Sequence, residues 1–357
     1  MPSWFNLNRA WTYEPLRQHP ADQATRWGKQ SKIKLGLGIV LSVGIVLLLA
    51  RFTFHSESYN PLDNYQNINA LPVTHVPSSE GGRRAVVSAL YSDGFAIAVA
   101  VLGHSTTAAN VSARLILPYL EGRISPKALC IVRSTGWEPQ LVPFIPPPHD
   151  GQSIHARFRD QYTKLNIWTL DKMGIDTAVY LDADTLVRRN FDELFDSPFN
   201  FAAVPDVYGA GDPRGFSLTF NAGVLAYRPS SAVFDDMLQK LQTASYPLKQ
   251  AEQAFLNLYF GGTAMRLPYI YNANLAIKQR SPILWERLVP EMRVIHYTTV
   301  KPFQEHMDAI LSPEELEEVM DRGARREGGF FREEVGWWRE AYERMMREHG
   351  DAIRRCY

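Results

Sequence analysis

The sequence has few cysteines, no net charge and no internal repeat. Its two cysteines, Cys130 and Cys356, are too few for a disulfide framework, and Cys130 lies in an apolar run where a packed core thiol is expected. Basic and acidic residues balance at 38 each. Because the chain lacks the basic excess that drives counterion release, nucleic acid is excluded as an expected partner.

Charge is also absent from the stretch Leu35–Ala50. Its apolar character all round disfavours a buried core helix, and the lack of a following small-x-small site disfavours a cleaved signal peptide. Extended to 33–54, it approaches the roughly 20 residues of a spanning helix, so an uncleaved signal-anchor in the lipid bilayer is predicted. Basic residues gather before it, which predicts a single-pass type II protein of the Golgi membrane with its catalytic domain in the lumen.

This anchor separates segments of different composition. The residues before it are polar, as in a disordered tail, and those after it are rich in Ser, Asn, Pro and Gly, as in a stem. The predicted segments are a cytosolic tail at 1–32, the transmembrane anchor at 33–54, a luminal stem at 55–87, a catalytic domain at 88–310 and a C-terminal helical extension at 311–357.

Continuous apolar runs of strand length alternate with helical patterns in the catalytic domain. Strands are predicted at Phe95–Val101, Ala128–Val132 and Thr177–Leu181, and helices at 109–120 and 162–173. Strands that are apolar throughout are typical of a parallel sheet covered on both faces. The predicted fold class is therefore α/β, a doubly wound, mostly parallel sheet of the kind that binds nucleotides.

Three helix signals lie further along the chain. Asn190–Glu193 and Ser312–Glu315 both have the form of a capping box, and the second places Pro at the first helical position. Phe330–His349 has an amphipathic pattern, in which Trp337 and Trp338 are expected to pack.

Two carboxylates one residue apart, Asp182 and Asp184, follow the predicted strand Thr177–Leu181. Ligands of α/β sheets bind at the carboxyl ends of strands, and two hard oxygen ligands suit a divalent cation that also binds a diphosphate. The motif alone is weak, because a chance Asp-x-Asp is expected in a chain of this length. His296 ends another apolar run and is a candidate third ligand, which would favour manganese; a structural histidine is the alternative.

Six motifs in a fixed order make this hypothesis more specific. They are YTKLNIW at 162–168, VYLDADTLV at 179–187, FNAGV at 220–224, Glu252-Gln253, LPYIYN at 267–272 and VIHYTTVKPF at 294–303. Together they resemble glycosyltransferase family 8, in particular its glycogenin-like members and their fungal, membrane-anchored relatives. The resemblance spans about residues 95–305 and implies a nucleotide-sugar transferase fold of the GT-A type.

The resemblance also implies which residues hold the donor. Asp182, Asp184 and His296 would bind manganese, and Asp182 would also approach the donor ribose. Lys164 and Lys301 would contact the donor phosphates, a role that suits a flexible point charge.

Around the transferred sugar the resemblance implies roles for Asn221 and Gln253. Glu252 stands where glycogenin-like enzymes have Asp, so its contact with the sugar stays open. The implied activity is a retaining transfer of a hexosyl group from a UDP-sugar to a glycan or glycoprotein acceptor. No residue is an obvious nucleophile, which favours a same-face displacement in which the donor phosphate deprotonates the acceptor. A homodimer is the assembly considered.

Two alternatives remain open. Phosphatases of the haloacid dehalogenase type also place Asp-x-Asp after a strand, but their Thr stands four residues after the first Asp, whereas Thr185 stands three after Asp182. A catalytically inactive, membrane-anchored nucleotide-sugar-binding protein of the same fold is the second, and the presence of Asp184, His296 and Lys164 disfavours it.

Overall fold

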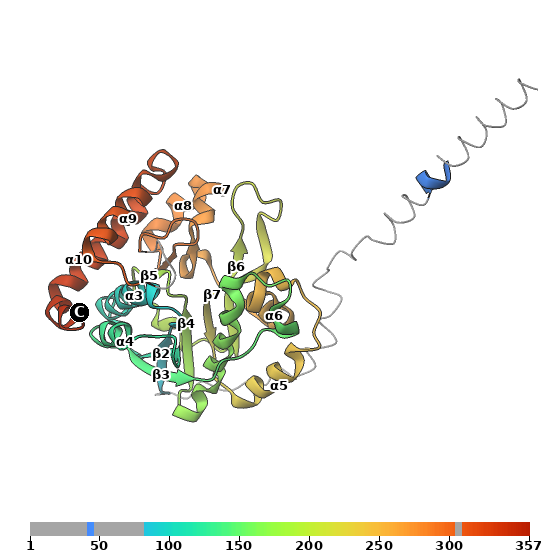
Figure 1. Cartoon of the computed structure of the whole chain (residues 1–357), viewed down its shortest axis with the longest axis horizontal. Coiled ribbons are helices and arrows are strands. Elements are labelled where there is room, and N and C mark those ends of the chain that lie inside the picture. Colours follow the sequence, from blue (N-terminus) through green and yellow to red (C-terminus); the bar gives the residue numbers. More distant parts are fainter. Residues whose placement is uncertain (1–40, 46–81, 304–308) are drawn as a thin grey trace, which may run out of the picture. The chain divides into compact units, whose positions relative to one another are not determined.

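The computed structural model describes residues 41–45, 82–303 and 309–357 (Figure 1). The chain divides into two compact units, Met1–Tyr59 and Asn60–Tyr357, and within the first the structure describes helix at residues 41–45. The predicted cytosolic tail and most of the predicted anchor and stem lie outside the described residues. The features below belong to the second unit.

The prediction of a Golgi membrane protein requires correction. None of the helices described between residues 41 and 357 combines the length and the apolar character needed to cross a membrane, which takes about 20 residues. Of the predicted anchor at 33–54, the structure describes only residues 41–45. The type II topology, the luminal placement and the bilayer partner are therefore no longer assigned.

The second unit is built on a seven-stranded sheet. In spatial order its strands are β3 (Glu138–Val142), β2 (Arg114–Leu120), β1 (Arg84–Val87), β4 (Thr177–Leu181), β7 (Phe216–Tyr227), β6 (Phe201–Val207) and β8 (Met265–Arg266). Strands β3, β2, β1 and β4 are parallel, whereas β7 is antiparallel to both β4 and β6. The α/β class is confirmed, and the sheet is mixed but mostly parallel, because β7 alone runs against the direction that the other strands share.

Strand β1 shows that the predicted stem ends too late. Arg84–Val87 lies within the stretch 55–87, yet Ala85, Val86 and Val87 are buried and the strand pairs on both sides. The folded domain therefore begins by Arg84, because a central strand cannot belong to a solvated linker.

A second, three-stranded sheet brings distant residues to the end of β4. It consists of β5 (Thr185–Val187), β10 (Val294–His296) and β9 (Ala273–Asn274), in the order β5-β10-β9. Strand β10 runs antiparallel to β5 and pairs His296 with Thr185, directly after Asp184. The pairing places His296 beside the two carboxylates.

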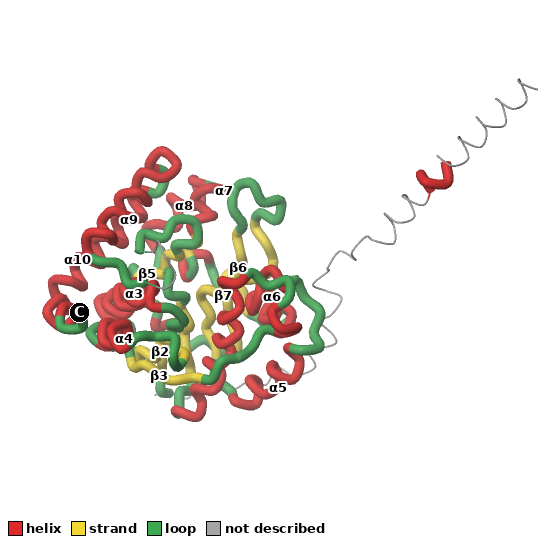
Figure 2. Tube along the Cα trace, viewed as in Figure 1, coloured by secondary structure: helices red, strands yellow, loops and turns green. Residues whose placement is uncertain are grey.

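Helices lie on both sides of the large sheet (Figure 2). They are α3 (Ala96–Ala108), α4 (Pro126–Arg133), the 3-10 segment η4 (Ala156–Met173), α5 (Ser231–Leu241), α6 (Ala251–Phe260), α7 (Leu275–Arg280), α8 (Pro282–Leu288), α9 (Pro313–Arg325) and α10 (Arg332–Arg354). In Figure 1, α3, α4, α9 and α10 lie to one side of the strands and α5 and α6 to the other.

Two of the predicted strands are helices. The run Phe95–Val101 belongs almost entirely to α3, which is buried from Ala96 to Thr106, and an apolar run of this kind cannot distinguish a buried helix from a strand. The run Ala128–Val132 lies in α4, whose start is marked by Ser125, which caps the Ala128 N–H, and by Pro126. The predicted helix at 109–120 contains β2 instead, whereas Thr177–Leu181 is confirmed as a strand.

The downstream helix signals gave mixed results. Ser312 and Glu315 form the predicted capping box of α9. Asn190 accepts a hydrogen bond from the Asp192 N–H at 2.8 Å, but only a 3-10 turn follows, at Asp192–Leu194. The predicted helix Phe330–His349 is confirmed as α10, and its Trp338 is buried.

The C-terminal helices share their core with the rest of the domain. One apolar cluster joins Ile97 and Val101 of α3 to Trp338 and Met345 of α10. In the first turn of α10 the buried Glu334 accepts hydrogen bonds from Lys278 and from the Trp285 indole, at 2.7 and 3.0 Å. The predicted extension at 311–357 is thus packed against the catalytic domain.

A disulfide fixes the last turn of this extension, which corrects the expectation of a free thiol. Cys130 of α4 is bonded to Cys356, which follows α10, across a sequence separation of 226 residues. No local pattern predicts this bond, because two cysteines this far apart are paired only by the fold.

Replacing Cys356 with Ser should lower the free energy of unfolding by about 2–5 kcal/mol, because the bond restricts the unfolded chain over a long loop. Thermal unfolding with and without reductant measures this. Wild type should lose several degrees of Tm on reduction and C356S should lose none. If the Tm of wild type were the same with and without reductant, the disulfide would be contradicted.

Candidate functional site

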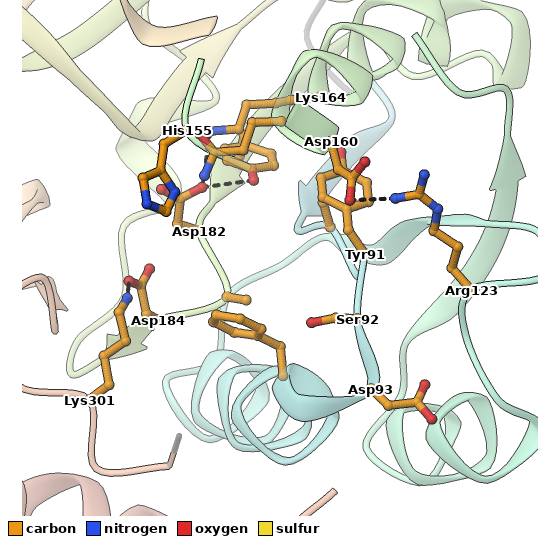
Figure 3. A pocket seen from close by; sticks show the side chains of 15 residues that line it. Tyr91, Ser92, Asp93, Arg123, His155, Asp160, Lys164, Asp182, Asp184 and Lys301 are labelled. Atoms are coloured by element: carbon orange, nitrogen blue, oxygen red, sulfur yellow. Dashed lines mark hydrogen bonds and ion pairs between the residues drawn. The ribbon is translucent and has the colours of Figure 1, made fainter. Parts of the chain in front are cut away.

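A cavity of about 680 Å³ opens at the carboxyl end of β4. Figure 3 shows Asp182, Asp184 and Lys301 on one side of it, and the Arg123–Asp160 ion pair on the other. Asp182, Asp184 and Lys301 were predicted from sequence. The other residues that line the cavity are Ala89, Tyr91, Ser92, Asp93, Phe95, His155, Gln161, Lys164, Tyr180 and Ala183.

A tight turn presents Asp182 to the cavity. Its N–H donates to the Gly223 carbonyl of β7 at 2.8 Å, and its own carbonyl accepts from both the N–H and the hydroxyl of Thr185. The Asp182 carboxylate accepts hydrogen bonds at one oxygen, Oδ1, from Tyr180 at 2.8 Å and from Lys164 at 3.1 Å. Its other oxygen, Oδ2, is directed toward His296.

Asp184 lies between two basic side chains. Its Oδ1 is 3.1 Å from Nε2 of His296, and its Oδ2 is paired with Nζ of Lys301. Burial would raise the pKa of the Asp184 carboxyl, but Lys301 and the neighbouring His296 ring outweigh it and hold the pKa well below its ordinary value. Asp184 therefore stays ionised and able to bind a cation.

Asp182, Asp184 and His296 together offer a metal site. One donor atom from each lies within 4.8 Å of the others, and Nε2 of His296 is 3.9 Å from Oδ2 of Asp182. Two hard carboxylates and one imidazole form a donor set that fits a divalent cation such as Mn²⁺. The fit depends on Nε2 of His296 carrying a free lone pair toward the carboxylates.

A chain of hydrogen bonds assigns that tautomer. The Gly223 N–H can only donate, so the atom of Asn221 at 2.9 Å from it is the acceptor Oδ1. The same oxygen accepts from Nδ2 of Asn272 at 2.9 Å, which turns Oδ1 of Asn272 toward His296 Nδ1 at 3.0 Å. Nδ1 of His296 therefore carries a proton, and Nε2 is left as the ligand atom.

The side-chain amides of Asn221 and Gln253 surround Asp206, near the end of β6. Its Oδ1 accepts from Asn221 at 3.1 Å and its Oδ2 from Gln253 at 2.9 Å, while Oε1 of Gln253 accepts from the Ala222 N–H at 3.0 Å. Burial raises the pKa of Asp206, and the hydrogen bonds from Asn221 and Gln253 oppose that rise. The network holds both amides in fixed orientations next to the carboxylates of β4.

Lys164 and Glu252 form a buried ion pair below the cavity. Nζ of Lys164 is 2.8 Å from Oε1 of Glu252 and 3.3 Å from the Ala222 carbonyl. Burial lowers the pKa of Lys164, but Asp182 and Glu252 raise it beyond its ordinary value, so the ammonium stays charged. Burial also raises the pKa of Glu252 despite Lys164. Among the described residues, Oε2 of Glu252 has no hydrogen-bond partner.

Of the site residues predicted from sequence, Lys164, Asp182, Asp184 and Lys301 line this cavity, and the others are linked to one another or to these by short contacts. They form three groups: Asp182 with Lys164 and Glu252, Asp184 with His296 and Lys301, and Asn221 with Gln253. Sequence reasoning missed Tyr180, Asp206 and Asn272, which contact these groups, and the polar residues on the far side of the cavity, such as Arg123 and Asp160. Asp206 gave a signal that could have been used, since it follows a buried apolar run as Asp182 does.

Comparison with known proteins identifies the family of this chain. Residues 87–306 match glycosyl transferase family 8. Galactinol synthase 2 of Solanum lycopersicum is 32% identical over an alignment of 212 residues. The alignment covers 50% of this chain and 60% of that protein. Inositol phosphorylceramide glucuronosyltransferase 1 of Arabidopsis thaliana is 30% identical over 216 residues, 60% of this chain and 36% of that protein. The chain thus spans less than two thirds of these relatives.

Among solved structures, the apo form of the bifunctional glycosyltransferase WbbM is similar, with a TM-score of 0.48 and 18% identity over 76% of this chain and 53% of that one. That similarity is too low to support an argument, whereas the family match covers most of the chain, from β1 to just past β10. On that match, the chain belongs to glycosyl transferase family 8.

Proposed function

We propose that this protein is a retaining hexosyltransferase that takes its sugar from a UDP-sugar and requires manganese. The observation that carries the proposal is the convergence of Asp182, Asp184 and His296 within 4.8 Å, at the edge of a cavity of about 680 Å³. A carboxylate pair with an imidazole serves a divalent cation, and the cavity has room for a nucleotide.

The residues around the cavity supply charge and orientation. A divalent cation, when bound by Asp182, Asp184 and His296, supplies Lewis-acid stabilisation of the negative charge on a departing diphosphate. Lys301 adds a positive charge on the same side, where it pairs with Asp184. Because these groups are held in place before the donor arrives, they stabilise charge without reorganising.

The sugar is proposed to lie over Asn221, Gln253 and Asp206. Their mutual hydrogen bonds fix which oxygen or N–H each presents, and fixed donors and acceptors discriminate between sugar hydroxyl configurations. Among the described residues, Oε2 of Glu252 has no hydrogen-bond partner, whereas Oε1 pairs with Lys164.

Retention is proposed to proceed by same-face displacement. The Glu252 carboxylate is buried and bound to Lys164, and the Gln253 amide is a poor nucleophile, so neither suits a covalent intermediate. The acceptor oxygen bonds to the anomeric carbon as the bond from that carbon to the phosphate oxygen breaks. The acceptor proton moves to the leaving phosphate oxygen, and positioning supplies much of the rate.

The acceptor is proposed to be a glycan or glycoprotein hydroxyl, and two relatives widen the set to be tested. Their names refer to galactinol and to inositol phosphorylceramide, so inositol-containing acceptors belong beside glycans in an acceptor screen. UDP release from a panel of UDP-sugars with Mn²⁺ tests the proposal directly. Donor binding without UDP release from any of them would favour an inactive binding protein.

Asp184→Ala should lower the rate of UDP release by at least about 100-fold, because it removes a cation ligand and leaves Lys301 without its partner. Steady-state kinetics with Mn²⁺ measure the loss. Asp196→Ala, which removes an exposed carboxylate paired with Arg84, is the matched control and should keep full activity. Unchanged turnover in D184A would reject the metal site.

Gly223→Ala should weaken Mn²⁺ binding by about 10- to 100-fold, since disturbing the residues that orient a ligand has this effect. An added Cβ would clash with Cε1 of His296 and lie 2.7 Å from its Nδ1 and 2.8 Å from Oδ1 of Asn221. The Mn²⁺ dependence of UDP release reports the change.

Gly336→Ala is the control for that substitution, because an added Cβ there has no described neighbour within 4 Å. It should leave the Mn²⁺ dependence unaltered. If G223A bound Mn²⁺ like wild type while keeping its fold by circular dichroism, His296 would not be a ligand.

A further inference from the structure

A second group of potential metal ligands lies away from the cavity, between α3 and α10. It consists of His104 on α3 and the adjacent Glu348 and His349 on α10. One donor atom from each lies within 4.8 Å of the others. Nδ1 of His104 is 3.6 Å from Oε2 of Glu348, and the two imidazole ring centroids are 5.6 Å apart. The family match ends at residue 306, so it accounts for neither α10 residue.

His104 is the unusual member of this group. It is 2% exposed on a helix whose other buried residues are mostly apolar, and its Nδ1 faces the Glu348 carboxylate. A buried imidazole nitrogen beside a carboxylate and a second imidazole is a donor that a cation can use.

We propose that His104, Glu348 and His349 bind a second divalent cation, Zn²⁺, which ties the C-terminal helix to the catalytic domain. Two imidazoles and a carboxylate are a donor set that Zn²⁺ accepts, with water as the fourth ligand. Zinc–ligand bonds are about 2.0–2.2 Å long, so the donors must approach one another further. The Glu348 side chain is 62% exposed and free to move.

The fold holds the two helices in place for such a site. Helix α10 packs on α3 through the cluster that contains Val101 and Met345, and the Cys130–Cys356 disulfide closes the end of α10 soon after His349. The donors are therefore brought together before any cation binds.

Zinc binding to the untagged full chain tests this inference without measuring activity. Asp184→Ala serves as the background, because it disables the candidate site at β4. Equilibrium dialysis against Zn²⁺ should give one bound ion per chain, and saturating Zn²⁺ should raise Tm by about 5 °C. Adding His349→Ala or Glu348→Ala should weaken binding by at least about 10-fold and remove the Tm shift.

Glu343→Ala in the same background is the matched control, because it removes an exposed carboxylate from the same helix. It should bind Zn²⁺ like the background. Both α10 ligands are at the surface or half-buried, so their variants should fold, and circular dichroism checks this. The inference is overturned if the background binds no Zn²⁺, or if H349A and E348A bind it as tightly as E343A.

Discussion

The antiparallel pairing of β10 with β5 is the constraint on which the active site depends. Asp182 and Asp184 are one residue apart in the chain, but the imidazole proposed to complete their donor set is more than a hundred residues away. Because His296 pairs with Thr185, its ring is delivered to within 3.1 Å of Asp184. Strand β9 continues the same small sheet and follows Asn272, which holds the other nitrogen of that ring. One three-stranded sheet thus positions both the ligand and the residue that orients it.

The buried charges around β4 also depend on groups that the fold brings together from distant parts of the chain. Lys164 is almost fully buried, which is tolerable because Asp182, Glu252 and a backbone carbonyl surround its ammonium. The adjacent network of amides takes its polarity from the N–H groups of Ala222 and Gly223, two backbone donors that cannot reverse. The side chains proposed to meet the sugar and the cation are therefore oriented by the backbone of β7, and Gly223 leaves the space that His296 occupies.

The C-terminal helices are part of the domain that carries this site. Glu334 fixes the start of α10 on α7 and α8, and the disulfide fixes its end on α4. Tyr297, one residue after His296, also donates a hydrogen bond to the Glu334 carbonyl at 2.8 Å. The extension therefore supports the segment that carries the proposed metal ligand His296, which makes its docking relevant to the site as well as to stability.

The sequence by itself determined the α/β class, the strand that ends in Asp182 and Asp184, the capping box of α9 and the family. These features depend on local patterns, and the ordered motifs named the residues that the structure brings together around Asp182 and Asp184, but not Tyr180, Asp206, Asn272 or the Arg123–Asp160 pair. Only the tertiary structure decided that Phe95–Val101 lies mainly in a helix, because a fully buried run has no periodicity to read. It also decided that Cys130 meets Cys356 and that His104 meets Glu348 and His349. Such contacts join residues far apart in the chain, and no local pattern encodes which distant segments the fold will bring together.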